Sequence, residues 1–145
     1  MLHAFLFNGF LITLAVLVHY EMLYRLSVLM PKLAMPHRPR VLVAVFGALC
    51  VHVVEIWLFG FGYYFMTQFL SLGMLHGVSQ GGFNQSVLDC VYFSFTTYTS
   101  LGFGDIHPLG HIRFLAGLEA LTGILLMSWT ASFLFIEMQK FWLKK

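Results

Sequence analysis

Residues 86–105 read Ser-Val-Leu-Asp-Cys-Val-Tyr-Phe-Ser-Phe-Thr-Thr-Tyr-Thr-Ser-Leu-Gly-Phe-Gly-Asp. Ser86 is followed three positions later by Asp89, a spacing that resembles a capping box with Asp in place of the usual Glu or Gln. This pattern predicts a short helix that starts near Val87. We expect the helix to end around residues 97–99, because the two glycines that follow require a different backbone.

Long apolar stretches lie on both sides of this segment. One runs from about residue 41 to 69, another from about 112 to 137, and a third lies nearer the N-terminus, at about 4–30. Each is long enough to cross the hydrocarbon core, which takes about 20 apolar residues in a helix. The apolar segment at 87–99 is too short to cross and return, and irregular chain at membrane depth must be buried or line a wet cavity. We therefore predict an all-α membrane protein with three transmembrane helices, a re-entrant helix and a loop.

The composition agrees with a lipid environment. The chain has 145 residues, of which 59% are hydrophobic and 10% are charged, and its mean hydropathy is +0.83. Water-soluble domains carry about 25% charged residues. Without a cluster of Lys or Arg, nucleic acid is not an expected partner. A chain of this length cannot enclose a pore by itself but can form one subunit of a ring.

Basic residues predict the orientation in a cell membrane. They flank the first connection and the C-terminus, which the positive-inside bias places in the cytoplasm. The N-terminus and residues 71–111 then lie outside the cell. No signal peptide is evident, so we expect the first apolar stretch to remain as an anchor. The basic residues that carry this argument are Arg25, Lys32, Arg38, Arg40, Lys140, Lys144 and Lys145.

The family resemblance rests on residues 97–105, Thr-Tyr-Thr-Ser-Leu-Gly-Phe-Gly-Asp. This segment resembles the potassium-channel signature Thr-x-Thr-Thr-Val-Gly-Tyr-Gly-Asp. Ser100 stands where the signature has threonine, Leu101 where it has valine and Phe103 where it has tyrosine. The resemblance covers about residues 41–137, in the order outer helix, pore helix, selectivity filter and inner helix.

The resemblance implies a domain division and a mechanism. Residues 1–40 would be an additional transmembrane helix with a cytoplasmic loop. Residues 41–145 would be the pore domain, with the pore helix at 87–99, the filter at 100–104 and the inner helix at 112–137. In potassium channels, four such loops replace the hydration shell of the ion with rings of carbonyl oxygens. The expected ion-binding residues are Thr99, Ser100, Leu101, Gly102, Phe103 and Gly104, with K⁺ at Ser100, Leu101, Gly102 and Phe103.

The expected protein is a homotetrameric potassium channel and not an enzyme. Its partners would be membrane lipid and permeant monovalent cations, and no cofactor is expected. Ser100 lacks the β-methyl group that stiffens threonine, and Phe103 lacks the phenol that many relatives hydrogen-bond behind the filter. A weakly selective cation channel therefore remains the main alternative.

Other positions take expected roles from the resemblance. Asp105 would lie at the outer mouth and could hydrogen-bond Tyr92 behind the filter. Gly123 resembles the hinge glycine of the inner helix, although a packing glycine is also possible. The histidines at 107 and 111 could sense protons or metal, or be ordinary interfacial residues. Three residues on one helical face would line the inner cavity, namely Leu125, Ser128 and Ser132.

Ionisable residues within the spans must face protein or water, because a charge at the bilayer centre costs about 2.5–3.5 kcal/mol. His52 and Glu55 are three apart and could pair, and Glu119 could brace the pore helix. Two rival functions also remain. One is a redox anchor in which His19 and His52 bind haem, and the other is a non-conducting accessory subunit of a channel.

Overall fold

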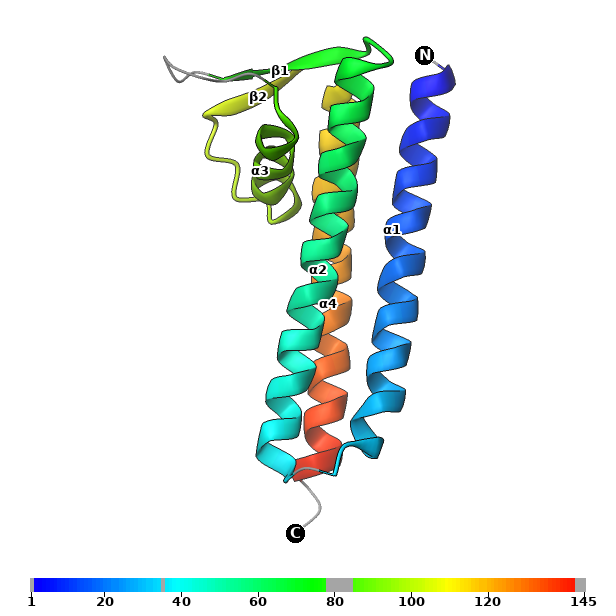
Figure 1. Ribbon diagram of the computed structural model, residues 1–145, viewed down its shortest axis with the longest axis vertical. Coiled ribbons are helices and arrows are strands. Elements are labelled where there is room, and N and C mark those ends of the chain that lie inside the picture. The colour runs from blue at the N-terminus through cyan, green and yellow to red at the C-terminus, as the bar shows by residue number, and fades with distance from the viewer. Residues whose placement is uncertain (1, 35, 78–84, 143–145) are drawn as a thin grey trace.

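The computed structural model describes residues 2–34, 36–77 and 85–142. Three long helices and one short helix make up most of this part of the chain (Figure 1). In chain order the elements are α1 (Leu2–Leu29), a 3₁₀ turn η1 (Met30–Lys32), α2 (His37–Gln68), β1 (Gly73–Gly77), α3 (Val87–Tyr98), β2 (Ile106–Gly110) and α4 (Ile112–Trp142).

The long helices α1, α2 and α4 lie side by side and alternate in direction (Figure 1). Each contains a segment long and apolar enough to cross a membrane, namely Leu2–Lys32, Pro39–Gln68 and Ile112–Lys140. The N-terminal end of α1 lies at the same end of the bundle as α3 and the two strands, and α4 ends at the opposite end. The prediction of a mostly helical membrane protein with three spans is confirmed, and a short helix with a returning loop lies between the second and third of them.

Helix α1 packs on the other helices along one stripe. Its buried residues recur at intervals of three and four, which is the period of one helical face. Helix α1 lies close to α2 at Gly62, where a β-carbon would lie 2.5 Å from Cδ1 of Leu11, so a larger residue there would displace the leucine side chain. The buried residues of α1 are Ala4, Asn8, Leu11, Ala15, His19, Leu23 and Leu26.

The short helix α3 begins as the sequence predicts. The backbone N–H of Asp89 donates to the Ser86 hydroxyl at 3.2 Å, and the Asp89 carboxylate accepts from the backbone N–H of Ser86 at 2.9 Å. These reciprocal bonds are a capping box, and they satisfy two donors at the start of the helix. Helix α3 packs closely on α2, where a β-carbon at Gly60 would lie 2.6 Å from Cγ2 of Val91.

A two-stranded antiparallel ribbon, which the sequence analysis did not predict, joins the segments before and after α3. Strand β1 pairs with β2 in a register that sets Gly73 opposite Gly110 and His76 opposite His107. Leu75 is buried in the same core as the helices and attaches the ribbon to the bundle. The two strands are separated by α3 and its loop, so their pairing depends on how the whole loop folds.

Candidate functional site

The segment after α3 turns back toward the end of the bundle from which α3 entered, and joins β2 (Figure 1). Its backbone alternates: Ser100, Gly102 and Gly104 have φ angles of +57°, +53° and +78°. Leu101 and Phe103, which lie between them, do not have positive φ angles. Alternation of this kind turns successive peptide units so that neighbouring carbonyl groups can face one side of the strand.

All six residues from Thr99 to Gly104 are exposed in the single chain. A β-carbon at Gly102 or Gly104 would meet nothing within 4 Å, so one side of the segment is open. The other side is fixed to α3, because the backbone N–H of Gly102 donates to the carbonyl of Thr96 at 3.1 Å. The Thr99 hydroxyl also donates to the carbonyl of Phe95, at 2.7 Å.

Asp105 fixes the C-terminal end of this segment. Its Oδ2 accepts a 2.7 Å hydrogen bond from the Tyr92 hydroxyl, and its Oδ1 accepts one of 3.0 Å from the backbone N–H of Ile106. The bond to Asp105 raises the pKa of the Tyr92 phenol above its ordinary value. The phenol therefore remains a protonated donor at neutral pH, and it ties the segment after Gly104 to helix α3.

Tyr98 fixes the N-terminal end. Its hydroxyl donates to Oε2 of Glu55 on α2 and lies 3.0 Å from Nδ1 of His52. Nδ1 of His52 lies 3.2 Å from the same Glu55 oxygen, so the expected pairing of these two residues is present. Tyr98 is fully buried and precedes residues 100–104 by two positions. The loop is thus held from behind by Tyr92 at one end and by Tyr98 at the other.

Glu119 of α4 is hydrogen-bonded to both α2 and α3. Its Oε1 accepts a 2.5 Å hydrogen bond from Ser94 on α3, and its Oε2 accepts one of 2.5 Å from Tyr63 on α2. The Ser94 hydroxyl also lies 2.8 Å from the carbonyl of Ile56. Glu119 is fully buried, and its carboxylate braces the pore helix as the sequence analysis expects.

Gly123 of α4 lies against the end of α3. A β-carbon at this position would be 2.1 Å from the carbonyl oxygen of Tyr98 and 3.0 Å from its carbonyl carbon. This close packing explains why position 123 is a glycine. Helix α4 runs without interruption from Ile112 to Trp142, and the hinge role of Gly123 stays a prediction.

The expected cavity-lining residues of α4 share one exposed face. Leu125, Ser128 and Ser132 are all exposed, and each serine hydroxyl donates to the backbone carbonyl four residues earlier. Glu137 lies elsewhere. It is only 4% exposed, and its Oε1 accepts a 2.5 Å hydrogen bond from Nζ of Lys140. The structure therefore does not place Glu137 on the face that carries the serines.

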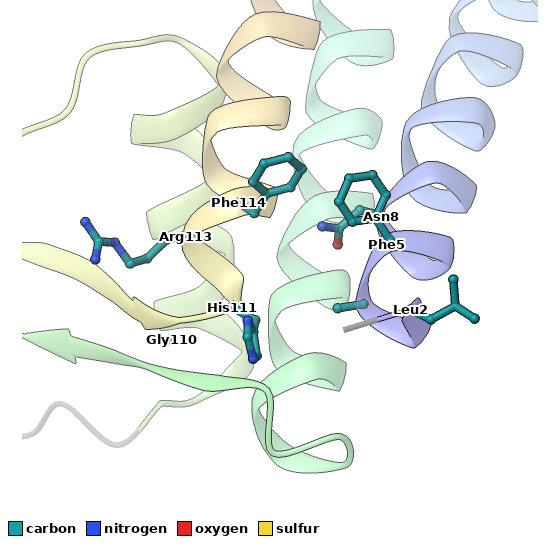
Figure 2. A pocket seen from close by; sticks show the side chains of 8 residues that line it. Leu2, Phe5, Asn8, Gly110, His111, Arg113 and Phe114 are labelled. Carbon is teal, nitrogen blue, oxygen red and sulfur yellow. The ribbon is translucent and has the colours of Figure 1, made fainter.

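A cavity of about 690 Å³ lies between the start of α1 and the start of α4. Figure 2 shows Phe5 and Phe114 at this site with the Asn8 side chain between the helices, whereas Arg113 points away from them. The two phenyl rings lie 5.2 Å apart. Because none of the residues 99–104 lines it, this cavity is separate from the site described above.

Sequence reasoning missed the role of two side chains, Tyr98 and His19. Nδ1 of His19 on α1 lies 2.8 Å from Oε1 of Glu55, so α1 is joined to the same carboxylate as the pore helix. A signal was available, because ionisable residues within spans must find polar partners. Their pairing depends on which helices are neighbours and at what depth, and the sequence does not state this.

A protein-family model described as an ion channel matches residues 41–140. The match begins in α2, includes α3 and residues 99–105, and ends within α4, so that it covers well over half of the chain. Helix α1 lies outside it. No curated protein and no solved structure matched the chain.

Proposed function

The chain belongs to the ion channel family, in its two-helix pore type, and on this premise we propose that it is one subunit of a homotetrameric potassium channel. It is a multi-pass membrane protein with three candidate spans. In the proposed assembly, four copies bring residues 100–104 together around one axis. Potassium ions pass down their electrochemical gradient without chemical turnover and without a cofactor.

The backbone of the filter segment is the observation that carries this proposal. Ser100, Gly102 and Gly104 have positive φ angles, and Leu101 and Phe103 between them do not. Carbonyl groups arranged in this way can replace the hydration shell of a cation when four segments face one another. The proposed K⁺ ligands are the residues from Ser100 to Phe103, with Thr99 and Gly104 at the two ends.

The exposure of the single chain supports assembly around this segment. Leu101 is 60% exposed and Phe103 is 65% exposed, although both are large apolar side chains. Neighbouring subunits would cover them. The exposed face of α4 with Leu125, Ser128 and Ser132 would then line the cavity below the filter, and Asp105 would lie at the outer mouth.

We also propose that the filter end of the bundle faces the outside of the cell. The basic residues Arg25, Lys32 and Arg40 lie toward the opposite end, where the positive-inside bias predicts cytoplasm. Arg113 lies near the filter end, so the bias is strong but not complete. Labelling of Leu2→Cys by a membrane-impermeant maleimide on intact cells would be expected, and labelling only after lysis would reverse the orientation.

Ion flux from purified protein in liposomes tests the function. Wild-type protein should pass K⁺ much faster than Na⁺, and Gly102→Ala should remove K⁺ flux because alanine is strained at a φ of +53°. Gly9→Ala is the matched control, since this exposed glycine on α1 has nothing within 4 Å of its β-position.

The outcomes separate the candidate functions. Unchanged K⁺ flux in Gly102→Ala would contradict the filter assignment, and absence of flux from the wild-type chain alone would favour an accessory subunit. Similar fluxes of Na⁺ and K⁺ would favour the weakly selective cation channel. The observation that favours that alternative is the departure from the signature at two positions. Ser100 lacks the β-methyl group of threonine, and Phe103 lacks the hydroxyl group of tyrosine.

A further inference from the structure

Two histidines and one glutamate from different helices meet in the middle of the bundle. His19 comes from α1, and His52 and Glu55 come from α2. One nitrogen or oxygen atom from each lies within 4.8 Å of the others, which is close enough to hold a metal ion. The selectivity filter uses none of these side chains.

The distances within this cluster suit a small ion. Nδ1 of His19 lies 2.8 Å from one oxygen of Glu55, and Nδ1 of His52 lies 3.2 Å from the other. Ligand atoms about 2.0–2.2 Å from a tetrahedral Zn²⁺ ion are separated from one another by about 3.3–3.5 Å. An ion could therefore bind between the two Nδ1 atoms and the carboxylate after shifts of a few tenths of an ångström at the carboxylate and a closure of the two rings, whose ligand atoms lie within 4.8 Å of each other.

The donor set selects the kind of ion. Two imidazole nitrogens with one carboxylate suit Zn²⁺ and neighbouring transition metals, whereas Mg²⁺ and Ca²⁺ prefer sites made of oxygen atoms. The two rings lie 5.5 Å apart, and both contact the same carboxylate. The Glu55 carboxylate therefore occupies the position between the two rings where a porphyrin would have to lie. The cluster is suited to a single ion and not to haem.

Neighbouring groups are placed to support the ligands. The hydroxyl of Thr130 on α4 lies 3.4 Å from Nε2 of His19, where it can accept the remaining N–H of a ring whose Nδ1 binds metal. The hydroxyl of Tyr98 contacts both Glu55 and His52. It can support the carboxylate or occupy a fourth position on the ion.

The cluster is mostly buried. The side chains of His19 and Glu55 are fully buried, while that of His52 is 16% exposed. Removal of water strengthens the attraction between a divalent cation and the one carboxylate.

We propose that His19, His52 and Glu55 form a binding site for one divalent transition-metal ion of the Zn²⁺ class. The ion joins α1 to α2 beside Tyr98, at the inner end of the filter segment. This inference does not depend on potassium selectivity, because its primary readout is metal binding and not ion flux.

Cobalt binding tests the proposal on the intact protein. Purified wild-type protein in detergent, first treated with EDTA, should bind one Co²⁺ per chain with visible d–d absorption of low-symmetry nitrogen and oxygen ligation. Zn²⁺ should abolish this absorption by displacement and should raise the unfolding temperature by several degrees, because it binds the folded state. Absence of both effects in wild-type protein would overturn the proposal and leave a hydrogen-bonded clamp.

Variants assign the site. His52→Gln should lose the absorption while its amide still reaches Glu55 and Tyr98, and His19→Gln should do the same. The control is the double change His76→Gln with His107→Gln, which removes the cross-strand pair whose rings lie 5.0 Å apart on the ribbon. Absorption that survives in His52→Gln, or that is lost in the ribbon variant, would overturn the assignment.

A spectroscopic measurement on wild-type protein covers the case in which the core variants do not fold. X-ray absorption at the zinc edge should show two imidazoles and a carboxylate. Thiolate scattering, which would come from Cys50 or Cys90, would contradict the proposed ligands.

Discussion

The α-carbon of Gly123 approaches the carbonyl oxygen of Tyr98 so closely that a β-carbon would lie 2.1 Å from it. Tyr98 ends helix α3 just before the filter segment. Inner helix and pore helix are therefore in backbone contact at the point where the loop begins. A displacement of α4 at this level would therefore press on the chain just before residues 100–104.

We predict that Gly123→Ala destabilises the protein by about 1–3 kcal/mol, the usual cost of overpacking. Alanine normally stabilises a helix interior relative to glycine by about 1 kcal/mol. A decrease in the free energy of unfolding would therefore indicate the packing contact, and an increase would indicate helix propensity alone. The readout is the unfolding temperature in detergent. Gly117→Ala on the same helix is the control, because nothing lies within 4 Å of its β-position; an equal loss in both variants would argue against this contact.

Ser100 has a φ of +57°, a region that β-branched residues rarely adopt. We predict that Ser100→Thr, although it restores the residue of the potassium-channel signature, lowers K⁺ flux several-fold, through strain of about 1 kcal/mol or more. Flux in liposomes measures this, with Ser27→Thr as a control at a helical position of α1, outside the pore domain. A rise in flux or in preference for K⁺ over Na⁺ in Ser100→Thr would show that threonine fits this backbone.

Tyr92→Phe removes the 2.7 Å hydrogen bond to Asp105 at the outer end of the filter. We expect the fold to be retained, since Tyr92 is exposed, and the K⁺ to Na⁺ flux ratio to fall several-fold. The measurement is the flux ratio of the two ions. A variant with wild-type selectivity would indicate that this bond does not hold the filter.

The same hydrogen bond predicts a pH dependence. The pKa of Tyr92 is raised in the folded protein, mainly by the bond to Asp105. The stabilisation of the folded protein by this hydrogen bond is therefore complete below the ordinary tyrosine pKa of about 10. It is lost as the pH rises through the raised pKa of Tyr92. Selectivity due to this bond should be unchanged from pH 7 to 9, and a loss within that range in wild-type but not in Tyr92→Phe would contradict the assignment.

Glu119 accepts hydrogen bonds from both Ser94 and Tyr63, so the two donors are coupled through one carboxylate. We expect Ser94→Ala and Tyr63→Phe each to destabilise the protein by about 0.6–1.7 kcal/mol, the range for such bonds within membranes. A double-mutant cycle on unfolding should show non-additivity. Thr13→Ala, which removes only a bond to the carbonyl of Gly9 at an exposed position of α1, should have a smaller effect.

Much of the architecture follows from local features of the sequence. The apolar stretches are long enough to span a membrane and leave only one arrangement for the shorter segment between them. Ser86 and Asp89 define the start of α3 through bonds three residues apart, and the glycines at 102 and 104 mark where the backbone leaves the helix. The residue order of the filter then indicates the family.

The tertiary structure decided what joins these parts. The pairing of β1 with β2, the bond from His19 to Glu55 and the contact of Gly123 with Tyr98 all link residues far apart in the chain. Spacing along one helix predicts the face on which a residue lies, but not the depth or identity of its partner on another helix. The sequence by itself determined the spans, the re-entrant loop and its glycines, whereas packing between helices determined which buried polar groups hold the loop in place.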